Sequence, residues 1–358
     1  AQFNLGVIYE QTNYVPHDYK KAIYYYTLAA KNNHTIAQHI LGLIYCEYEY
    51  VPKDIDKGIY YLSLAAKKNY ADSEVYLGYL YLEGKIINKN INKAIDYFTK
   101  AAKHDHPLGY YNIGMIYFEG KIFKQDIHKA IYYFEFAADK KYPLAQNILG
   151  SIYFDDRYHL KNINKAIYYY TQASNQGYEL AQLNLFFIYF EQKKYNKALN
   201  YLLLSAEKFI EAKFILGFLY FDGFYVDKDL TKALKLFKEI SSFNHQYAKN
   251  NLAFMYRHGY GVEKNISHAI VYYNEAIEKD DEVSMFNLAH IYFYGELGET
   301  NFDKAIELLI KSSNKNFDCS KILLSLVLIQ KLRPISFENI QYKLKDKKLA
   351  NEIYYCIK

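Results

Sequence analysis

Two histidines that flank an aspartate, His104-Asp105-His106, are the residues of this chain whose types and spacing come nearest to a metal site. Imidazole nitrogens and carboxylate oxygens are common ligands of zinc and other transition metals. The triplet falls between two helical patterns, where polar turn residues belong, and no further ligand lies close by in the sequence. We therefore predict no metal and no other cofactor.

The remaining short motifs are also better explained by structure than by chemistry. Gly259-Tyr260-Gly261 has the glycines of a phosphate-binding loop, but no strand precedes it. The glycosylation sequons at Asn33 and Asn265 are expected by chance in a chain so rich in Asn. No serine, cysteine or lysine stands in a recognisable nucleophile motif. The sequence predicts that the chain is not an enzyme.

Composition excludes several further classes of protein. The chain is 51% hydrophobic and 23% charged, which indicates a folded protein rather than a disordered one. Its net charge of +5 comes from 44 basic and 39 acidic residues, without the basic footprint of a nucleic-acid binder. The longest apolar run, residues 322–329, is far shorter than the roughly 20 residues that span a bilayer. We predict no nucleic-acid partner and no membrane insertion.

A period of 36 residues organises the chain. Such a period is the signature of a solenoid, in which each unit contacts only its neighbours. The predicted array covers residues 1–319 as nine repeats, of which the unit 181–211 is short, and residues 320–358 form a degenerate tenth repeat and a C-terminal helical cap. Cysteines do not recur with the period, so no disulfide framework is expected. The nine repeats open at Ala1, Ala37, Ser73, Gly109, Ala145, Ala181, Ala212, Ala248 and Ser284.

Each repeat has the pattern of two antiparallel helices. In the first repeat, Leu5 and Tyr9 recur at helical spacing, and Pro16 ends that helix. Asp18 stands where its carboxylate can cap a second helix. The small residue at the Gly6 position lets the two helices approach closely. The sequence thus predicts an all-α solenoid of stacked helix hairpins, with the Tyr9 position in the core between adjacent repeats.

The repeat carries the pattern Ala-x-x-x-Leu-Gly-x-x-Tyr, a glycine loop, Asp or Asn, and Lys-Ala-x-x-Tyr-Tyr-x-x-Ala-Ala, as in residues 1–30 and again in residues 250–276. This pattern resembles the Sel-1-like repeat family, a relative of the tetratricopeptide repeats. The resemblance extends to about Asn316 and implies a right-handed superhelix. Members of the family are mostly adaptors and scaffolds. A cysteine-rich bacterial branch has a disulfide in each repeat, and this chain lacks those cysteines.

Two functions follow from these observations. The first is a protein–protein interaction scaffold that binds a partner protein or peptide on its concave face. The alternative is a regulatory or targeting module of a larger enzyme or complex, such as a kinase fusion or a ubiquitin-ligase and endoplasmic-reticulum degradation adaptor. Because the chain begins without Met on a core position, we expect a monomeric segment of a longer protein. A cytoplasmic location is favoured over the secretory pathway.

The partner is expected on the first helix of each repeat, because first helices line the concave face of such a stack. The third and seventh positions of each repeat, counted from its opening residue, vary in type while the core positions do not. We expect the four phenylalanines of the short unit and its neighbours to form one apolar strip that takes a basic partner segment with apolar anchors. The alternative is that the rings pack between hairpins and the acids are solvated. The candidate residues are Phe187, Phe214, Phe218, Phe254, Tyr79, Tyr111 and Phe286, with Glu191 and Asp222 at the rim.

Overall fold

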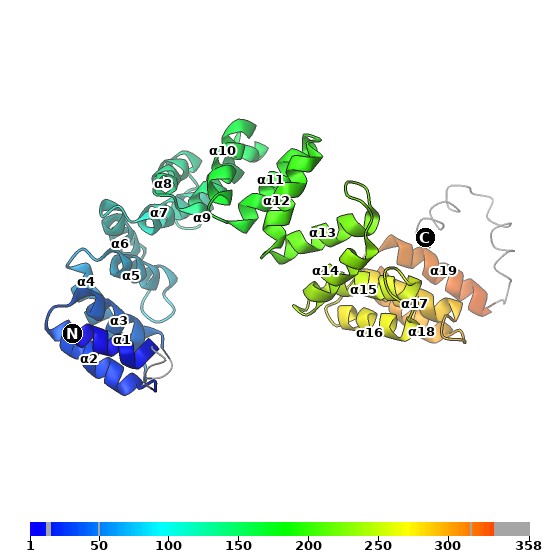
Figure 1. Cartoon of the computed structure of the whole chain (residues 1–358), viewed down its shortest axis with the longest axis horizontal. Helices are drawn as coiled ribbons and strands as arrows, with labels where there is room; N and C mark the ends of the chain where they lie inside the picture. The colour runs from blue at the N-terminus through cyan, green and yellow to red at the C-terminus, as the bar shows by residue number, and fades with distance from the viewer. Residues whose placement is uncertain (12–15, 49–50, 316, 333–358) are drawn as a thin grey trace. The chain divides into compact units, whose positions relative to one another are not determined.

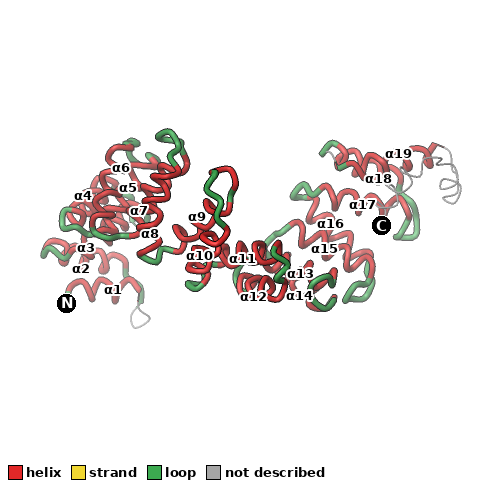
Figure 2. Tube along the Cα trace, turned by 90° about the horizontal axis from the view of Figure 1, so that it is seen from above, coloured by secondary structure: helices red, strands yellow, loops and turns green. Residues whose placement is uncertain are grey.

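The structure, a computed structural model, describes the whole chain except residues 12–15, 49–50, 316 and 333–358. Its described residues form helices joined by loops and contain no strand (Figure 2). The chain divides into two compact units, Ala1–Gln192 and Lys193–Lys358, which we call unit 1 and unit 2. Within each unit, the predicted all-α solenoid is confirmed.

Unit 1 consists of α-helices that follow one another as hairpins, with one short 3-10 helix, η1. The helices are α1 (Gln2–Gln11), α2 (Tyr19–Lys31), α3 (Thr35–Cys46), α4 (Ile55–Ala66), α5 (Ala71–Glu83), α6 (Ile91–Lys103), α7 (Pro107–Glu119), α8 (Ile127–Asp139), α9 (Pro143–Phe154), η1 (Asp156–Tyr158), α10 (Ile163–Ser174) and α11 (Glu179–Glu191).

Unit 2 continues the alternation of first and second helices. Its helices are α12 (Tyr195–Ala206), α13 (Ile210–Asp222), α14 (Leu230–Ser241), α15 (Gln246–His258), α16 (Ile266–Ile277), α17 (Glu282–Tyr294), α18 (Phe302–Ser313) and α19 (Asp318–Leu332). The expected cap at residues 320–358 is described only as far as α19, and its remainder lies outside the described residues. The boundary between the units falls in the loop of the predicted short repeat, after α11 and before α12.

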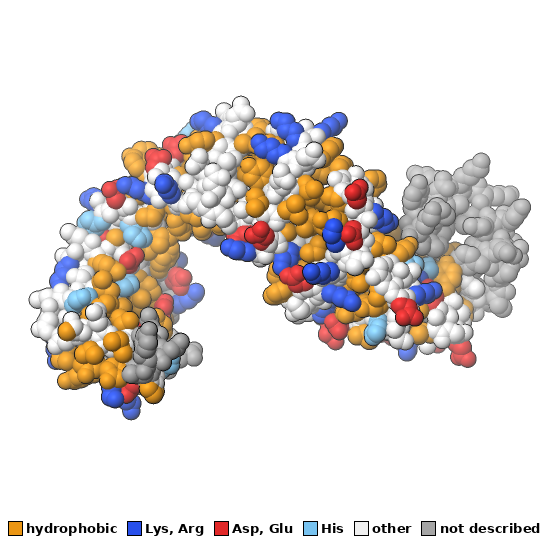
Figure 3. All heavy atoms as spheres, in the orientation of Figure 1, with side chains coloured by type: hydrophobic (Ala, Val, Ile, Leu, Met, Phe, Trp, Pro, Cys, Tyr) orange, Lys and Arg blue, Asp and Glu red, His pale blue; other side chains and the backbone are white. Residues whose placement is uncertain are grey.

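The hairpins stack by contacts between consecutive helices. Helix α3 packs on α4, α4 on α5, and α5 on α6, and this order continues along unit 1. In Figure 1, α3, α5 and α7 form the inner row of this unit and α4, α6 and α8 the outer row. First helices therefore share one side of unit 1, where hydrophobic side chains gather between scattered charged ones (Figure 3).

The predicted caps are confirmed at the starts of the second helices. The side chain of Asp18 accepts a hydrogen bond of 3.0 Å from the backbone amide of Lys21. The same hydrogen bond occurs in every repeat except the short one. In the short repeat, the residue at the start of α12 is Lys194, whose side chain does not cap the helix. Loss of such a cap typically lowers helix stability by about 1 kcal/mol. The equivalent residues are Asp54, Asn90, Asp126, Asn162, Asp229, Asn265 and Asn301.

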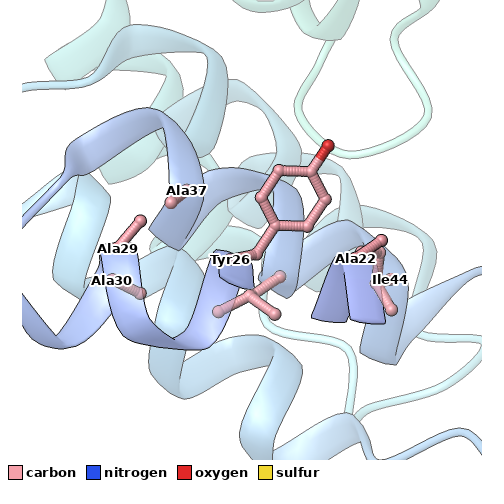
Figure 4. Close-up of a cluster of buried hydrophobic side chains, with 7 residues drawn as sticks. Ala22, Tyr26, Ala29, Ala30, Ala37 and Ile44 are labelled. Carbon is pink, nitrogen blue, oxygen red and sulfur yellow. The ribbon is translucent and has the colours of Figure 1, made fainter. Parts of the chain in front are cut away.

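Each hairpin closes around one large side chain from its second helix. In the hairpin of α7 and α8, the fully buried ring of Phe134 lies against Gly114, where a Cβ atom would stand 2.7 Å from the ring. Tyr26 fills the same place in the first hairpin, among Ala22, Ile44 and other buried residues (Figure 4). The close approach predicted from the small residue is confirmed. The equivalent large residues are Leu62, Phe98, Tyr170, Leu202, Phe237, Tyr273 and Leu309.

The Tyr9 position has a stacking partner that the repeat pattern did not indicate. Tyr117 is half-buried and stacks on Tyr133 of its own hairpin, with ring centroids 6.0 Å apart and planes 1° from parallel. The Lys129 Nζ lies 5.1 Å from the centroid of the Tyr117 ring, within the range of cation–π attraction. Tyr117 also packs against a buried cluster that includes Phe98 of the preceding repeat, so the position contributes to the core between repeats as predicted, while its stacked ring lies within its own hairpin.

Candidate functional site

In several repeats, the third position counted from the opening residue contacts a ring that precedes the next first helix. Tyr111 of α7 lies edge-on to Tyr142 at the start of α9, with ring centroids 5.1 Å apart. Phe286 is 6% exposed and packs on Phe317, so the prediction that it lines an open face is wrong. Phe286 belongs to a buried cluster with Leu309 of α18 and Leu323 of α19. The same contact pairs Phe3 with His34, His39 with Tyr70, and Phe214 with His245.

The seventh residue is more open to solvent. Phe187 and Phe218 are 45% and 49% exposed. Phe254 is half-buried beside His258 and Tyr260.

Phe214 is also half-buried, against the core ring of Phe237. Phe187 belongs to unit 1 and the other three phenylalanines of the expected strip belong to unit 2, so a continuous strip stays a prediction. Of the two rim acids, Glu191 is exposed and Asp222 is half-buried.

Two adjoining hollows lie over the first helices of unit 1. One has a volume of about 540 Å³ and lies over α5 and α7, and the other has a volume of about 480 Å³ and lies over α3 and α5. They share Tyr79, Glu83 and Lys85, and together we call them the unit 1 groove. Two predicted site residues, Tyr79 and Tyr111, line this groove. Its other apolar lining includes Tyr76, Leu80, Leu82, Met115, Ile116 and Ile122.

The rim of the unit 1 groove carries charges of both signs in pairs. The Glu83 carboxylate lies 3.0 Å from the Lys85 ammonium, and Glu119 lies 3.0 Å from Lys121 in the next repeat. Glu47 accepts a hydrogen bond of 2.6 Å from the hydroxyl of Tyr76. The charges of Glu83 and Glu119 are therefore balanced by neighbouring lysines, whereas Glu47 has a neutral hydrogen-bond partner.

Four tyrosines, one from each of α5, α7 and the starts of α9 and α11, have neighbouring hydroxyls. They are Tyr79, Tyr111, Tyr142 and Tyr178, and all are half-buried. Burial, followed by the neighbouring Tyr111, Tyr79 and Tyr178 hydroxyls, raises the pKa of Tyr142 to about 12. The Tyr142 hydroxyl is therefore a protonated donor at neutral pH. Within the described part of the chain, none of the four donates a hydrogen bond to another residue.

Sequence reasoning missed Tyr142 and Tyr178. The available signal was an aromatic residue three positions before a repeat opening, which occurs ahead of both Ala145 and Ala181. Met115, at the seventh position of its repeat, was also not among the site residues predicted from the sequence. Its side chain lines the unit 1 groove.

The histidines of the 104–106 triplet contact two separate carboxylates on α5. His104 Nδ1 lies 2.9 Å from the buried carboxylate of Glu74, and His106 Nε2 lies 3.1 Å from Asp72. The first contact joins the end of α6 to α5 within one hairpin, and the second joins the residue before α7 to α5. No group of three or more potential ligands that could hold a metal ion occurs among the residues with described positions.

A polar cluster is buried between α15 and α17 in unit 2. Arg257 is 6% exposed and its Nε lies 3.1 Å from both carboxylate oxygens of Glu296. Arg257 also donates to Nδ1 of His290, which requires that nitrogen to be unprotonated. Burial alone would raise the pKa of Glu296, but its polar contacts with His290 and Arg257 and the Arg257 charge lower it to about 2.

Unit 2 is expected to lose stability on acidification. Burial lowers the pKa of His290 below its ordinary value of 6.5, so the unfolded chain takes up protons first as the pH falls below that value. Glu296 adds a further loss between its ordinary pKa of 4.5 and about 2. Denaturant unfolding between neutral pH and mildly acidic pH measures the first loss.

The control for this pH dependence is His290→Asn, whose side-chain oxygen can still accept from Arg257 but does not titrate. The variant should show a smaller loss of stability than the parent protein over the same pH range. An identical pH profile for the two proteins would contradict a role for His290.

A family model and solved structures agree with this architecture. The family model described as Sel1 repeat matches residues 1–34, 35–70, 71–106, 107–142, 143–178, 180–208, 210–241, 246–281 and 283–317. The chain is similar to a protective antigen with an SLR fold from uropathogenic Escherichia coli, at 26% identity and a TM-score of 0.72, over 99% of this chain and 75% of that one. It is also similar to a Sel1 repeat protein from Oxalobacter formigenes, at 23% identity and a TM-score of 0.62, over 84% of this chain and 89% of that one. A comparison with curated proteins gives no match.

The helices of the described segments are also too short or too polar to cross a bilayer.

Proposed function

We propose that this chain, which belongs to the Sel1 repeat family, is a scaffold that binds an extended segment of a partner protein in the unit 1 groove. Repeats of this class generally mediate protein–protein interactions. The observation that supports this groove as the site is its lining, since Tyr79, Tyr111 and Met115 stand on successive first helices around two adjoining hollows. Aromatic side chains in a hollow are the usual anchors of a protein interface.

The lining fits a partner segment with apolar anchors. Tyr79 lies edge-on to the core ring of Phe98, with centroids 5.4 Å apart, and Tyr111 is held against Phe134 and Tyr142. These rings are therefore fixed before a partner arrives, which reduces the entropy lost on binding. Met115 adds a flexible apolar side chain that adapts to the shape of the bound residue.

Selection from a random peptide library on the purified protein tests this function. The groove variant Tyr79→Ala with Met115→Lys is expected to bind the selected peptides at least about tenfold more weakly, equivalent to about 1.4 kcal/mol. The matched control is Tyr132→Ala with Tyr168→Lys on the outer helices, where these tyrosines are 55% and 57% exposed. Peptides that bind the groove variant as tightly as the parent protein would contradict the proposal.

The exposed rings of Phe187 in unit 1 and Phe218 in unit 2 are further candidate anchors that the same peptides can test. Changing both residues to Ser is expected to weaken binding of a peptide that uses these rings by at least about tenfold, or about 1.4 kcal/mol. Because both rings are nearly half exposed, helicity measured by circular dichroism should be unchanged. Loss of helicity would show that these rings belong to the core, and unchanged affinity for every selected peptide would remove them from the site.

A further inference from the structure

The loops beside the unit 1 groove carry a surplus of positive charge. Residues 83–93 and 119–129 comprise the ends of α5 and α7, the loops that follow them and the first turns of α6 and α8. These two segments, which we call the lysine edge, contain six lysines and three acidic residues, whereas the whole chain has a net charge of only +5. The lysines are Lys85, Lys89, Lys93, Lys121, Lys124 and Lys129, and all are exposed.

Half of this positive charge is balanced within the chain. Each of the three acidic residues of the lysine edge has a lysine ammonium 3.0–3.7 Å from its carboxylate. The other three lysines, Lys89, Lys93 and Lys124, form no ion pair with a described residue. The Lys93 Nζ lies 4.9 Å from the centroid of the Tyr81 ring, a contact that leaves its charge unbalanced. Three positive charges therefore remain for a ligand.

Lys89 is held at the hollow over α5 and α7, which its side chain lines. The backbone amide of Asn90 donates a hydrogen bond of 2.9 Å to the carbonyl of Tyr81 and so closes the loop. Gly84 has a φ of 67°, and a Cβ atom added to it would stand 2.5 Å from the Cβ of Lys89. Only glycine adopts this conformation easily and leaves this space. The loop backbone therefore sets the position of the Lys89 stem before a ligand binds.

The surplus charge belongs to one of the two hollows. In the hollow over α3 and α5, the Glu47 and Lys53 side chains have opposite charges, and the shared pair of Glu83 and Lys85 is neutral. The hollow over α5 and α7 has two such pairs and Lys89 in addition. A segment that occupies both hollows thus meets apolar surface in each and positive charge in the second.

We infer that the partner segment of the unit 1 groove carries acidic residues beside its apolar anchors, and that these acidic residues lie at the lysine edge. This inference rests on the proposed function and names the chemistry of its partner. Complementary charges speed association and fix the direction of a bound segment, whereas a basic segment would be repelled. The sequence predicted a basic segment for the phenylalanine strip, but in this groove lysines follow and outnumber the acidic residues.

Selection from three matched peptide pools tests the inference. Every pool has the same random apolar core, flanked at both ends by three Glu, three Gln or three Lys residues. We expect the groove-dependent peptides to come from the Glu pool. A selected peptide should bind at least about tenfold more weakly when its Glu residues are changed to Gln, the summed effect of several exposed charge pairs. Added salt should weaken the Glu form and leave the Gln form nearly unchanged.

The double variant Lys89→Glu with Lys121→Glu reverses two charges that line the hollow. It is expected to weaken binding of a selected Glu peptide at least about tenfold, and to bind the Lys form of that peptide more tightly than the parent protein does. The matched control is Lys67→Glu with Lys103→Glu. These lysines are exposed at the ends of α4 and α6, and the control changes the net charge by the same amount.

The control variant should bind the Glu peptide as the parent protein does. Equal weakening by the control and by the groove variant would show that only the overall charge of the protein matters, and this would overturn the inference. Groove-dependent peptides that bind equally well with Glu, Gln and Lys flanks would overturn it too.

The two proposals fail in different ways. If selected peptides depend on Tyr79 and Met115 but not on their flanking charge, the ligand class is wrong and the scaffold function stands. If no peptide of any pool depends on Tyr79 and Met115, the proposed function itself fails.

Discussion

Replacement of Phe134 by Ala is expected to lower the free energy of unfolding of unit 1 by about 3–5 kcal/mol. The ring is fully buried between α7 and α8 and lies on Gly114. Its removal leaves a cavity that the stacked helices cannot close without moving their neighbours. Because stability in a solenoid is a sum of repeat and nearest-neighbour terms, amide hydrogen exchange should rise most in α7 and α8 and in the hairpins beside them.

The chain offers a matched control for this substitution. Leu occupies the equivalent place at Leu62, Leu202 and Leu309, each fully buried. Phe134→Leu is therefore expected to lower the free energy of unfolding by only about 1 kcal/mol. Equal losses for the Ala and Leu variants would show that the size of this side chain does not hold the hairpin together.

Replacement of Arg257 by Met is expected to lower the free energy of unfolding of unit 2 by about 3 kcal/mol. The change leaves the Glu296 carboxylate without its cation, although that carboxylate is only 23% exposed. We expect a loss at the low end of the range that is usual for breaking a buried ion pair, because the Glu296 side chain keeps some contact with water. Denaturant unfolding followed by hydrogen exchange of α15 and α17 measures the loss.

A double variant separates the lost ion pair from lost packing. Adding Glu296→Gln to Arg257→Met removes the unpaired charge, so the double variant should recover most of the lost stability. If the double variant were as unstable as Arg257→Met alone, the loss would come from the packing of the arginine rather than from the unpaired carboxylate.

The repeat pattern was sufficient to predict the hairpins. Small residues such as Gly114 and capping residues such as Asp126 act within one hairpin, so their roles depend on local spacing. The same pattern could not show that Tyr117 stacks on Tyr133. The two side chains can adopt several rotamers, and only some of these rotamers bring the rings together.

The candidate site was predicted only in part, because the exposure of a side chain depends on the residues of neighbouring repeats that pack over it. Phe214 and Phe286 have the same repeat position, yet Phe286 is buried under Phe317 while Phe214 is half-buried beside His245. Arg257 and Glu296 are 39 positions apart, so their contact needs the packing of two repeats. The division of the expected phenylalanine strip falls at the short unit 181–211, whose shortened loop is visible in the sequence, but repeat spacing alone does not predict two compact units.

The methionine methyl groups provide a direct test of the central claim, that the unit 1 groove binds the partner segment. The chain has three methionines. Met115 lines the groove, whereas Met255 and Met285 are buried in unit 2, at 0% and 3% exposure.

In a sample labelled only at these methyl groups, a bound library-selected peptide is expected to shift the Met115 resonance and to leave the other two unchanged. A peptide that binds while the Met115 resonance stays in place would contradict the assignment of the unit 1 groove as the binding site.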